Sequence, residues 1–458
     1  MNYIKEKSRT IVSLVTAPIT QNIAIIRISG PFTYKLINKI FDKKVPHISE
    51  KSIILLGKII KEKETIDQVL IFCFYNPNSF TGEDVVEISC HGNLIIVNRI
   101  IELILENGAE LATPGEFSKQ AFFNRKINLI QANAINDLIR APNLSTAKLA
   151  IQNFDSRKQK EFEKLENKIL EVIAHIEINI DYPEYDDIEK VTVEKLKKII
   201  KELIKDFDSI IKNGEKVKIY KEGIKVGIFG KPNVGKSTLL NALLDEEKAI
   251  VSPKAGTTRD IIEAKYSLKQ IPLILFDTAG IRKTKNEIEK KGIEKSKGIY
   301  KNLDISFLVL DNSKRWTKED DEIFDLIKEK KHILIINKND LKKNLKIPNY
   351  IDKSIIVEIS AEKGEIKKLE NKVESLFSSK IINDSSLYPL LSENWEQSKL
   401  KKIKKNLNEV LKALENKIPV DILAGELQTS FRLLREISGN DYNEDLLDII
   451  FSRFCLGK

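Results

Sequence analysis

Cysteine, tryptophan and methionine are scarce in this chain, whose 458 residues include three Cys, two Trp and one Met. The cysteines Cys73, Cys90 and Cys455 are too few and too dispersed to form a disulfide framework or a zinc site. No run of about 18 uncharged apolar residues occurs, so the sequence predicts no transmembrane helix. The segment Met1–Ala17 lacks the apolar core and the cleavage site of a signal peptide. Together these absences predict a cytoplasmic, reducing compartment.

The composition is that of a globular protein, with 42% hydrophobic and 31% charged residues. The length predicts about two to four domains. The net charge of +9 is compatible with an RNA partner. However, Lys, Ile and Asn are abundant along the whole chain, and a general drift in composition would raise the charge without any such partner.

The stretch from residue 1 to about 125 mixes short apolar runs with turn signals. Strand patterns cover Ile23–Ile28, Ile53–Ile60, Gln68–Tyr75 and Val85–Ser89, whereas Leu94–Asn107 has the apolar spacing of a helix. These patterns predict a small α+β domain.

From about residue 127 to residue 218 the pattern is helical. Glu161–Asn179 carries one apolar stripe and Val193–Lys212 carries another. The acidic, Pro-containing stretch Asp181–Asp187 between them is predicted to be a linker. Because both helices are amphipathic, they need partners that cover their apolar faces.

Strand and helix patterns alternate from Gly223 to about Leu376, which is typical of a mostly parallel α/β sheet. Helical patterns return afterwards at Glu396–Asn416, Pro419–Ser438 and Glu444–Phe451. We interpret this order as an α/β domain inserted into a helical domain. Two separate helical domains are the alternative interpretation.

A phosphate-binding motif follows the apolar strand pattern Ile224–Phe229. The next residues are Gly230-Lys-Pro-Asn-Val-Gly235-Lys236-Ser237, which fit G-x-x-x-x-G-K-[ST], and the helical run Thr238–Leu244 follows them. The glycines let backbone N–H groups face the phosphates, which then lie at a helix N-terminus. We expect Lys236 to reach the β- and γ-phosphates and Ser237 to bind Mg²⁺.

Two further strand patterns end in residues suited to magnesium and to guanine. Pro272–Phe276 runs into Asp277-Thr-Ala-Gly280, where the carboxylate can hold Mg²⁺ through water and Gly280 can donate its N–H to the γ-phosphate. Ile333–Ile336 runs into Asn337-Lys338-Asn339-Asp340, and the two oxygens of Asp340 match the N1–H and N2–H₂ donors of guanine. Adenine offers no such donor pair, so ATP would leave the carboxylate unpaired.

The last strand pattern, Ile355–Ile359, precedes Ser360-Ala361, where a backbone N–H can meet guanine O6. Gly256-Thr257-Thr258-Arg259-Asp260 lies between the first two motifs, and a Thr here can complete the Mg²⁺ shell when the γ-phosphate is present, as in a switch. A plain surface turn is the alternative. The residue after Gly280 is Ile281 and not the Gln that orients water in Ras-type enzymes. The motifs predict a GTPase in which water is activated from elsewhere.

The α/β domain that carries these motifs, the G domain, resembles the translation-factor-like GTPases that include Era, Der and MnmE. Motifs outside the G domain indicate which of these families applies. The motifs similar to the MnmE (TrmE) family are Arg27-Ile-Ser-Gly30, Ser79-Phe-Thr-Gly-Glu-Asp84, His91-Gly92, Pro114-Gly-Glu-Phe117, Ala121-Phe122, Asp181-Tyr-Pro-Glu184 and the terminal Phe454-Cys455-Leu456-Gly457-Lys458. This resemblance covers essentially the whole chain.

The resemblance implies a multidomain α+β and α/β protein whose three domains occupy four residue ranges. These are an N-terminal folate-binding and dimerisation domain (1–122), a helical domain in two parts (123–221 and 381–458) and an inserted P-loop G domain (222–380). It further implies a homodimer that forms a heterotetramer with the FAD-containing protein MnmG. With MnmG the protein would install a carboxymethylaminomethyl-type group at C5 of the wobble uridine of certain tRNAs, using GTP, Mg²⁺, K⁺ and a tetrahydrofolate derivative.

The resemblance also assigns residues at the nucleotide. The K⁺ ligands would be Asn233, Ser252, Lys254 through its carbonyl, and Thr257, although an Asn in a P-loop also serves packing. The Mg²⁺ ligands would be Ser237 and Thr258, and Glu289 would orient the water, with Glu287 as the nearby alternative. The expected GTP contacts are Asn233, Val234, Gly235, Lys236, Ser237, Thr238, Ser252, Pro253, Lys254, Ala255, Gly256, Thr257, Thr258, Asp277, Thr278, Ala279, Gly280, Asn337, Lys338, Asp340, Ser360 and Ala361.

For the folate derivative the resemblance implies Arg27, Glu87, Lys126 and Lys458. A pterin needs a carboxylate for its N–H edge, and the glutamate tail of a folate needs cations. Cys455 either acts in the modification chemistry or is a buried small hydrophobic residue.

Two other functions remain open on the sequence alone. A ribosome-assembly GTPase of the Era or Der kind would carry a second nucleotide domain or a KH domain with a G-x-x-G loop, and neither pattern follows the G domain. A signalling GTPase without an RNA substrate is the third possibility. The Lys-rich segment from Lys399 to Lys405 could contact tRNA phosphates, or it could be a solvated helix face.

Overall fold

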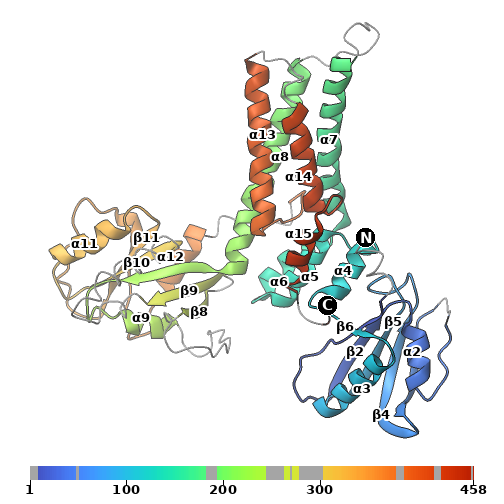
Figure 1. The fold of residues 1–458 in the computed structure, drawn as a ribbon. Helices are drawn as coiled ribbons and strands as arrows, with labels where there is room; N and C mark the ends of the chain where they lie inside the picture. The colour runs from blue at the N-terminus through green and yellow to red at the C-terminus, as the bar shows by residue number, and fades with distance from the viewer. Residues whose placement is uncertain are drawn as a thin grey trace, which may run out of the picture. The chain divides into compact units, whose positions relative to one another are not determined.

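The computed structural model describes residues 9–47, 51–181, 193–243, 263–268, 271–277, 303–377, 386–416, 424–454 and 457. Contacts divide the chain into two compact units (Figure 1). The first unit comprises Met1–Ile139, Phe162–Ile204 and Lys399–Lys458, and the second comprises Arg140–Glu161 and Lys205–Ser398. The domain boundaries expected from the sequence stay predictions.

The first unit contains a mixed sheet with the strand order β3-β4-β5-β2-β1-β6. Its elements are β1 (Ile11–Leu14), β2 (Ile23–Ser29), α2 (Thr33–Ile40), β3 (Ile53–Lys61), β4 (Glu64–Phe74), β5 (Val85–His91), α3 (Leu94–Glu106) and β6 (Glu110–Leu111). The four predicted strands and the predicted helix are confirmed, although β4 begins earlier than expected. Strands β1 and β6 and helix α2 were not predicted. The two strands are too short to show a period, and α2 is only eight residues long, although its buried residues Tyr34, Ile37 and Ile40 do recur at helical spacing.

Helices α2 and α3 pack against one face of this sheet. Their apolar residues, among them Ile37 and Ile104, are buried in one core with those of the strands. The opposite face follows the strand alternation and carries exposed apolar side chains at Ile54, Leu56 and Leu70. The sheet therefore has one covered face, while the other exposes apolar side chains among the described residues.

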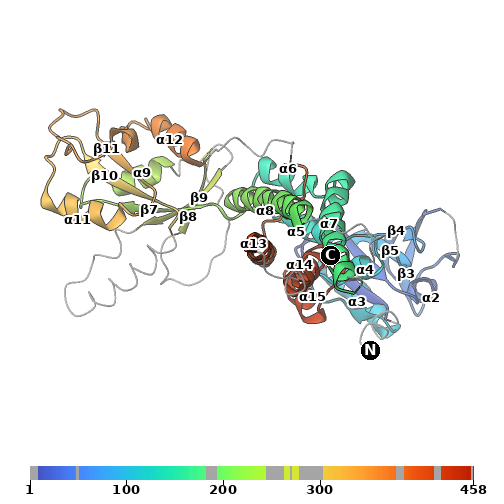
Figure 2. The same cartoon turned by 90° about the horizontal axis from the view of Figure 1, so that it is seen from above.

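The remaining part of the first unit is helical. Its helices are α4 (Glu116–Phe123), α5 (Leu129–Arg140), α14 (Ala424–Ser438), α15 (Glu444–Phe451) and parts of α7 (Ser156–Asp181), α8 (Val193–Glu222) and α13 (Asn394–Glu415). Helices α7, α13 and α14 lie side by side in Figures 1 and 2. The contacts between them include the hydrogen bond from Gln428 to Glu177 and the ion pair of Lys399 with Glu436.

The apolar stripes predicted for the long helices are buried as expected. In α7 they are Phe162, Leu165, Ile169, Val172, Ile173 and Ile176. The start of α14 as predicted, at Pro419, and most of the predicted linker Asp181–Asp187 lie outside the described residues. No helix in the described part of the chain is long and apolar enough to cross a membrane.

The second unit contains the predicted α/β sheet, with the strand order β12-β11-β10-β7-β9-β8. Its elements are α6 (Leu144–Gln152), β7 (Ile224–Phe229), α9 (Lys236–Leu243), β8 (Glu263–Leu268), β9 (Ile271–Asp277), β10 (Ile305–Asp311), α11 (Lys318–Ile327), β11 (His332–Asn337), the 3₁₀ turn η2 (Lys353–Ile355), β12 (Ile356–Glu358) and α12 (Lys367–Phe377). All neighbouring strands are parallel except β8 and β9. The mostly parallel sheet is thus confirmed.

Helices cover both faces of this sheet, as a parallel sheet requires. Phe307 and Val309 of β10 belong to a core with residues of α9 and α12, whereas Leu308 and Leu310 belong to a core with residues of α11. The carboxyl ends of β7, β9, β10 and β11 therefore come out at one edge of the sheet, where a doubly covered α/β sheet binds its ligand.

In the second unit, the segment that follows α12 is hydrogen-bonded to the end of α6. The side chain of Asn153 donates to the carbonyl of Leu390 at 3.0 Å and accepts the N–H of the same residue at 2.7 Å. Leu390 is buried in the same core as Val217 of α8 and Leu239 of α9. This arrangement fixes the segment that follows the α/β sheet onto the helices that precede it.

Candidate nucleotide site and the site of the N-terminal sheet

The phosphate-binding loop lies between β7 and α9, as predicted. Gly230 and Gly235 have φ values of +142° and +96°. A Cβ on Gly230 would clash with the carbonyl oxygen of Val309, and a Cβ on Gly235 would clash with the side-chain amide of Asn337. Glycine is therefore required at both positions by backbone angle and by space.

Lys236 and Ser237, which were predicted to contact phosphate and magnesium, are the first two residues of α9, directly after the loop. The Lys236 ammonium donates hydrogen bonds to the carbonyl oxygens of Gly230 at 2.9 Å and Lys231 at 2.7 Å, so it is held over the loop. Ser237 is exposed in the first turn of α9, and so is Thr238. Val234 is buried and contributes its backbone to the loop.

Asn337 joins the loop to the guanine motif. Its amide nitrogen donates to the carbonyl of Val234 at 3.0 Å, and its amide oxygen accepts the N–H of Ala361 at 3.0 Å. The side chain is buried at 2% exposure, so both bonds are shielded from water. One amide thus fixes three of the predicted GTP-contacting segments relative to one another.

Lys338 makes a second connection. It has a left-handed backbone with φ of 62°, and its ammonium donates to the carbonyl of Asn233 at 2.9 Å. The same ammonium forms an ion pair of 2.7 Å with Asp311, the last residue of β10. Burial tends to raise the pKa of Asp311, but hydrogen bonds from Lys338 and Ser313 outweigh it and lower the pKa overall.

Asp340 is exposed at the end of the guanine motif, and the hydroxyl of Ser360 donates to its carboxylate at 2.7 Å. This hydrogen bond is the main reason that the pKa of Asp340 lies below its ordinary value. The carboxylate is therefore ionised at neutral pH and can accept two N–H donors of guanine.

Other predicted nucleotide residues are not described. Asp277 is placed by its backbone, as the residue of β9 that pairs with Ile228 of β7, which puts it at the same edge of the sheet as the phosphate loop. The predictions for Ser252, Pro253, Lys254, Ala255, Gly256, Thr257, Thr258, Thr278, Ala279, Gly280, Glu287 and Glu289 lie outside the described residues.

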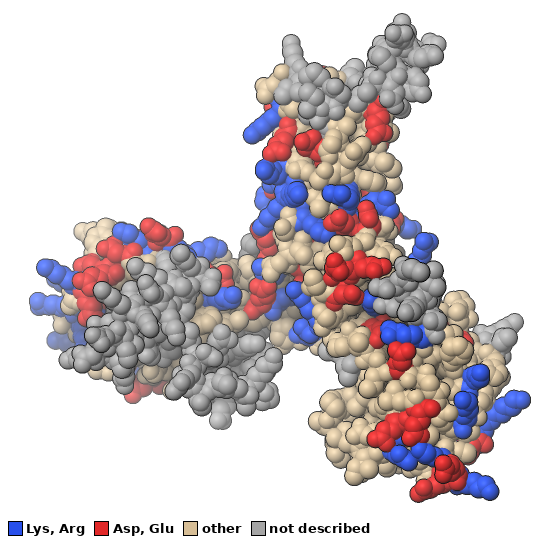
Figure 3. All heavy atoms as spheres, in the orientation of Figure 1, with Lys and Arg blue, Asp and Glu red and all other residues tan. Residues whose placement is uncertain are grey.

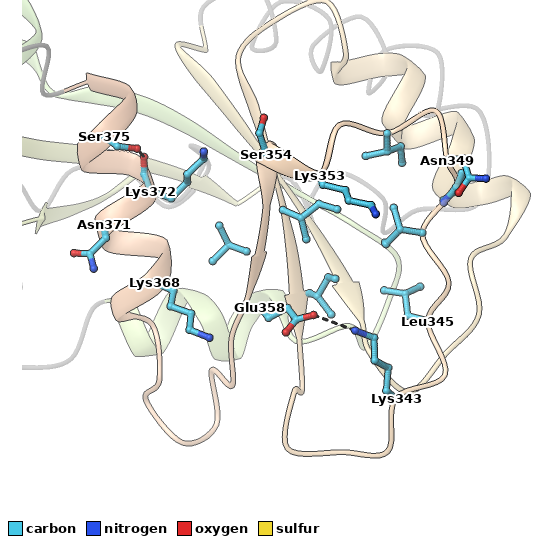
Figure 4. A pocket seen from close by; sticks show the side chains of 16 residues that line it. Lys343, Leu345, Asn349, Lys353, Ser354, Glu358, Lys368, Asn371, Lys372 and Ser375 are labelled. Carbon is cyan, nitrogen blue, oxygen red and sulfur yellow. Dashed lines mark hydrogen bonds and ion pairs between the residues drawn. The ribbon is translucent and has the colours of Figure 1, made fainter.

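A separate hollow of about 1080 Å³ lies beside β12 (Figure 4). Lys343, Lys353, Lys368 and Lys372 contribute to its lining, and Lys343 pairs with Glu358. Among the residues that the structure describes, none of the phosphate or guanine motif lines it, so its size does not mark the nucleotide site.

A second group of predicted residues comes together on the sheet face of the first unit that is opposite α2 and α3, where the side chains of Arg27 and Glu87 are only 13% and 22% exposed. Arg27 of β2 lies opposite Glu87 of β5 in the strand register, and two guanidinium nitrogens approach one carboxylate oxygen of Glu87, Nε at 2.8 Å and Nη2 at 2.7 Å. A third nitrogen donates to the carbonyl of Gly457 at 3.3 Å. The guanidinium also lies over the rings of Phe80 and Phe117, at 5.3 and 5.5 Å from their centroids.

Lys126, the third predicted folate residue, contacts the loop that contains Phe80. Its ammonium donates to the carbonyl of Pro77 at 3.0 Å, and a Cβ on Gly82 would press against its stem. Lys458 and Cys455 lie outside the described residues. Gly457 between them is described, and a Cβ there would lie 2.6 Å from the carbonyl oxygen of Leu14.

Sequence reasoning missed several residues that shape these sites. Asp311 ends a strand at the ligand edge, just as Asp277 does, and this signal could have revealed it. The amide contacts of Asn337 and the rings of Phe80 and Phe117 had no local signal, because each depends on segments that are distant in sequence.

The net charge of +9, which is compatible with an RNA partner, is not concentrated in one place on the visible surface (Figure 3). In Figure 3 acidic and basic side chains are interspersed on the visible face of each unit. The charge of +9 therefore does not gather into one basic field on that face.

Comparison with known proteins identifies relatives along nearly the whole chain. The family described as MnmE helical domain matches residues 129–455, and the one described as GTP-binding protein TrmE N-terminus matches residues 10–126. Proteins named tRNA modification GTPase MnmE from Clostridioides difficile and Acholeplasma laidlawii are each 42% identical and cover 98% of this chain and 99% of their own lengths. The one from Mycoplasmopsis pulmonis is 43% identical and covers 96% of this chain and 98% of its own length.

Among solved structures, Era from Aquifex aeolicus bound to GDP·AlF4⁻ is 28% identical, with a TM-score of 0.25, over 40% of this chain and 66% of its own. The two matched domain families, the relatives of similar length and the assembled phosphate and guanine motifs agree. The chain belongs to the MnmE family of tRNA modification GTPases, and it binds and hydrolyses GTP.

Proposed function

We propose that this GTPase is activated by K⁺ and that, together with MnmG, it installs a carboxymethylaminomethyl-type group at C5 of the wobble uridine of certain tRNAs. The observation that carries the proposal is the exposed Asn233, held in a left-handed conformation in the phosphate loop. Ile281 stands where Ras-type enzymes have the Gln that orients the attacking water, so another residue would take that role. K⁺ would stabilise the charge on the transition state, as an arginine finger does.

The residues present suit both ions. Within the described part of the chain the Asn233 side chain makes no hydrogen bond, which leaves its amide oxygen available to a cation. Asn233, Ser252, Lys254 and Thr257 would supply amide, hydroxyl and carbonyl oxygens, the donors that K⁺ prefers. Ser237 and Thr258 would supply the hydroxyls for Mg²⁺.

The ions and the loop acid would share the catalytic work. Mg²⁺ and K⁺ supply positive charge near the phosphates when bound. Lys236 would move from the loop carbonyls to the β- and γ-phosphates, and Glu289, or its neighbour Glu287, would orient the attacking water.

The K⁺ proposal is tested by GTP hydrolysis in KCl and in NaCl at equal ionic strength. We expect hydrolysis at least about tenfold faster in KCl, since an arginine finger, the group that K⁺ would replace, gives 10³ or more. Asn233→Ala should remove the difference. Equal rates in both salts would contradict a K⁺-dependent mechanism.

For the modification chemistry, the residues around Arg27 suit a folate derivative. Glu87 can accept the N–H edge of a pterin, and the cations Arg27, Lys126 and Lys458 can attract the glutamate tail. The folate would supply the one-carbon unit, and the FAD of MnmG would supply the redox chemistry. Cys455, next to the Gly457 segment in sequence, would take part in this chemistry or pack as a small apolar residue.

A homodimer is proposed because the open sheet face exposes Ile54, Leu56 and Leu70. Exposed apolar clusters of this kind mark association surfaces. Sedimentation of Leu56→Lys tests it, and an unchanged mass would place the dimer contact elsewhere. The heterotetramer with MnmG would form on this dimer.

Mass spectrometry of tRNA nucleosides from cells that lack this protein tests the modification itself. We expect the modified wobble uridine to disappear and to return when the wild-type chain is supplied. Unchanged wobble uridines would contradict the proposed product. A chain with Glu87→Gln, supplied instead of wild type, asks whether the first unit takes part.

A further inference from the structure

Two ion pairs between Lys and Asp attach the phosphate loop to the strands and helices around it. Lys338 pairs with Asp311 at 2.7 Å, and Lys231 pairs with Asp320 at 2.6 Å. Both carboxylates are buried, with 1% and 2% of their side-chain surface exposed. A buried carboxylate without its partner would be costly, so each pair defines a fixed point.

The two pairs reach different parts of the loop. Lys231 is itself a loop residue, and its ammonium is held by Asp320 in the first turn of α11. Lys338 comes from the end of β11, and its ammonium binds Asp311 and the carbonyl of Asn233 together. Only the pair with Asp311 therefore acts on the peptide of Asn233 through the contacts described.

The backbone of Asn233 needs such support. Its φ of 63° is a left-handed conformation, which costs free energy for a residue with a side chain. A hydrogen bond from Lys338 onto its carbonyl holds that peptide, and the direction of a side chain follows from the backbone that carries it. The position of the Asn233 amide oxygen thus depends on where the Lys338 ammonium is held.

Asp311 is itself held so that one oxygen faces Lys338. Ser313 donates its backbone N–H at 2.9 Å and its hydroxyl at 2.6 Å to Oδ1 of Asp311. Oδ2 is left for the ammonium of Lys338. The chain of contacts runs from Ser313 through Asp311 and Lys338 to Asn233.

We propose that Asp311 is a positioning residue for the K⁺ site: it holds the Lys338 ammonium on the carbonyl of Asn233 and so presets the amide oxygen that binds the ion. The inference rests on the proposed K⁺ role of Asn233. Asp311 would act on the ion through Lys338 and Asn233, so its removal lowers the affinity for K⁺ more than it lowers the maximal rate at saturating GTP and K⁺.

The test is a K⁺ titration of Asp311→Asn at saturating GTP, with Na⁺ replacing K⁺ at constant ionic strength. A second readout, independent of turnover, is the K⁺ concentration that gives half of the rise in melting temperature in the presence of GDP and aluminium fluoride. In both we expect the half-saturating K⁺ concentration to rise about tenfold, the size of effect of one hydrogen bond to a charged group.

Two further variants make the test specific. Ser313→Ala weakens the hold on Asp311 without touching Lys338, so we expect a smaller rise, of about threefold. Asp320→Asn is the matched control, because it removes an equally buried carboxylate from the other ion pair of the loop. Its half-saturating K⁺ concentration should stay within about twofold of wild type, since it does not hold Asn233.

The outcomes separate the inference from the proposal beneath it. If wild type shows no response to K⁺, the proposed K⁺ mechanism fails and the inference fails with it. If wild type responds and Asp311→Asn follows the same curve, the inference alone is overturned. An equal shift in Asp320→Asn would also overturn it. If Asp311→Asn does not fold, Ser313→Ala decides, and an unshifted curve refutes the inference.

Discussion

The nucleotide site of the second unit and the Arg27 site of the first unit are built in opposite ways. In the nucleotide site, loops at the ends of parallel strands are joined by the side chains of Asn337 and Lys338, which bind backbone carbonyls. In the other site, Arg27 and Glu87 project from the face of an antiparallel pair, and the carbonyl of Gly457 completes the arrangement. The nucleotide site is therefore formed by backbone groups that side chains hold in place. The Arg27 site is formed by two side chains, and a backbone carbonyl completes it.

The comparison predicts the largest effect for Asn337→Ala. This change leaves the carbonyl of Val234 and the N–H of Ala361 without partners in a buried place, at about 1–3 kcal/mol each. We expect the affinity for a fluorescent GDP analogue to fall about 100-fold or more. Asn339→Ala, an exposed Asn of the same motif, should change it by less than about threefold. Similar losses in both variants would show that the nucleotide site does not depend on the Asn337 amide.

A smaller effect is expected for Glu87→Gln. The variant removes the charge opposite Arg27, so binding of a tetrahydrofolate derivative, measured by fluorescence, should weaken about 10- to 30-fold. Glu106→Gln is the control, because Glu106 pairs with Lys61 at the exposed surface of the same sheet domain. Loss of GDP binding in Glu87→Gln would break the comparison, since the two sites would then not be separable.

Gly457→Ala probes the backbone that completes the Arg27 site. The residue has φ of +88°, and an added Cβ would lie 2.6 Å from the carbonyl oxygen of Leu14, so its carbonyl should shift away from Arg27. We expect folate binding to weaken about three- to tenfold, below the effect of losing the carboxylate. Gly364→Ala is the control. Gly364 also has a positive φ, but an added Cβ there has no atom within 4 Å, so the variant should leave folate binding unchanged. Equal behaviour of the two variants would remove Gly457 from the site.

The smallest effect concerns pH. The hydroxyl of Ser360 lowers the pKa of Asp340, so in wild type the charge that binds guanine is lost only as pH falls below the ordinary Asp value of about 3.9. In Ser360→Ala the pKa rises towards that value, and GDP affinity should decline earlier as pH falls. At pH 7 the two proteins should differ by less than about threefold. Parallel pH curves between about pH 5 and pH 3 would show that Ser360 does not tune Asp340.

The contrast also explains what the sequence could predict. The phosphate and guanine motifs were readable because each is a short run at the carboxyl end of a strand, as at Gly230 after β7 and Asn337 at the end of β11. Strands β2 to β5 of the first unit were readable from apolar runs, and the stripe of α7 from its helical period. The pairing of Arg27 with Glu87 needed the family resemblance, because strand register is not encoded locally.

Long-range polar contacts were beyond the sequence for a related reason. Asp311 and Lys338, or Asn153 and Leu390, are joined by packing of elements whose order in the sheet or bundle must be known first. Short elements such as β6 were missed because two residues carry no period. Tertiary pairing decides such elements, and local propensity does not.

The hydrogen bond between Arg27 and Gly457 has a consequence for biosynthesis. Arg27 and Glu87 are translated first, whereas the carbonyl of Gly457 is made 370 residues after Glu87 (457 − 87). At about 5–20 residues per second, Arg27 and Glu87 would wait roughly 20 to 75 s for this backbone contact. During that time its open apolar face and its unfinished site are present on a nascent chain. A chain released before Gly457 therefore lacks the carbonyl that completes the Arg27 site.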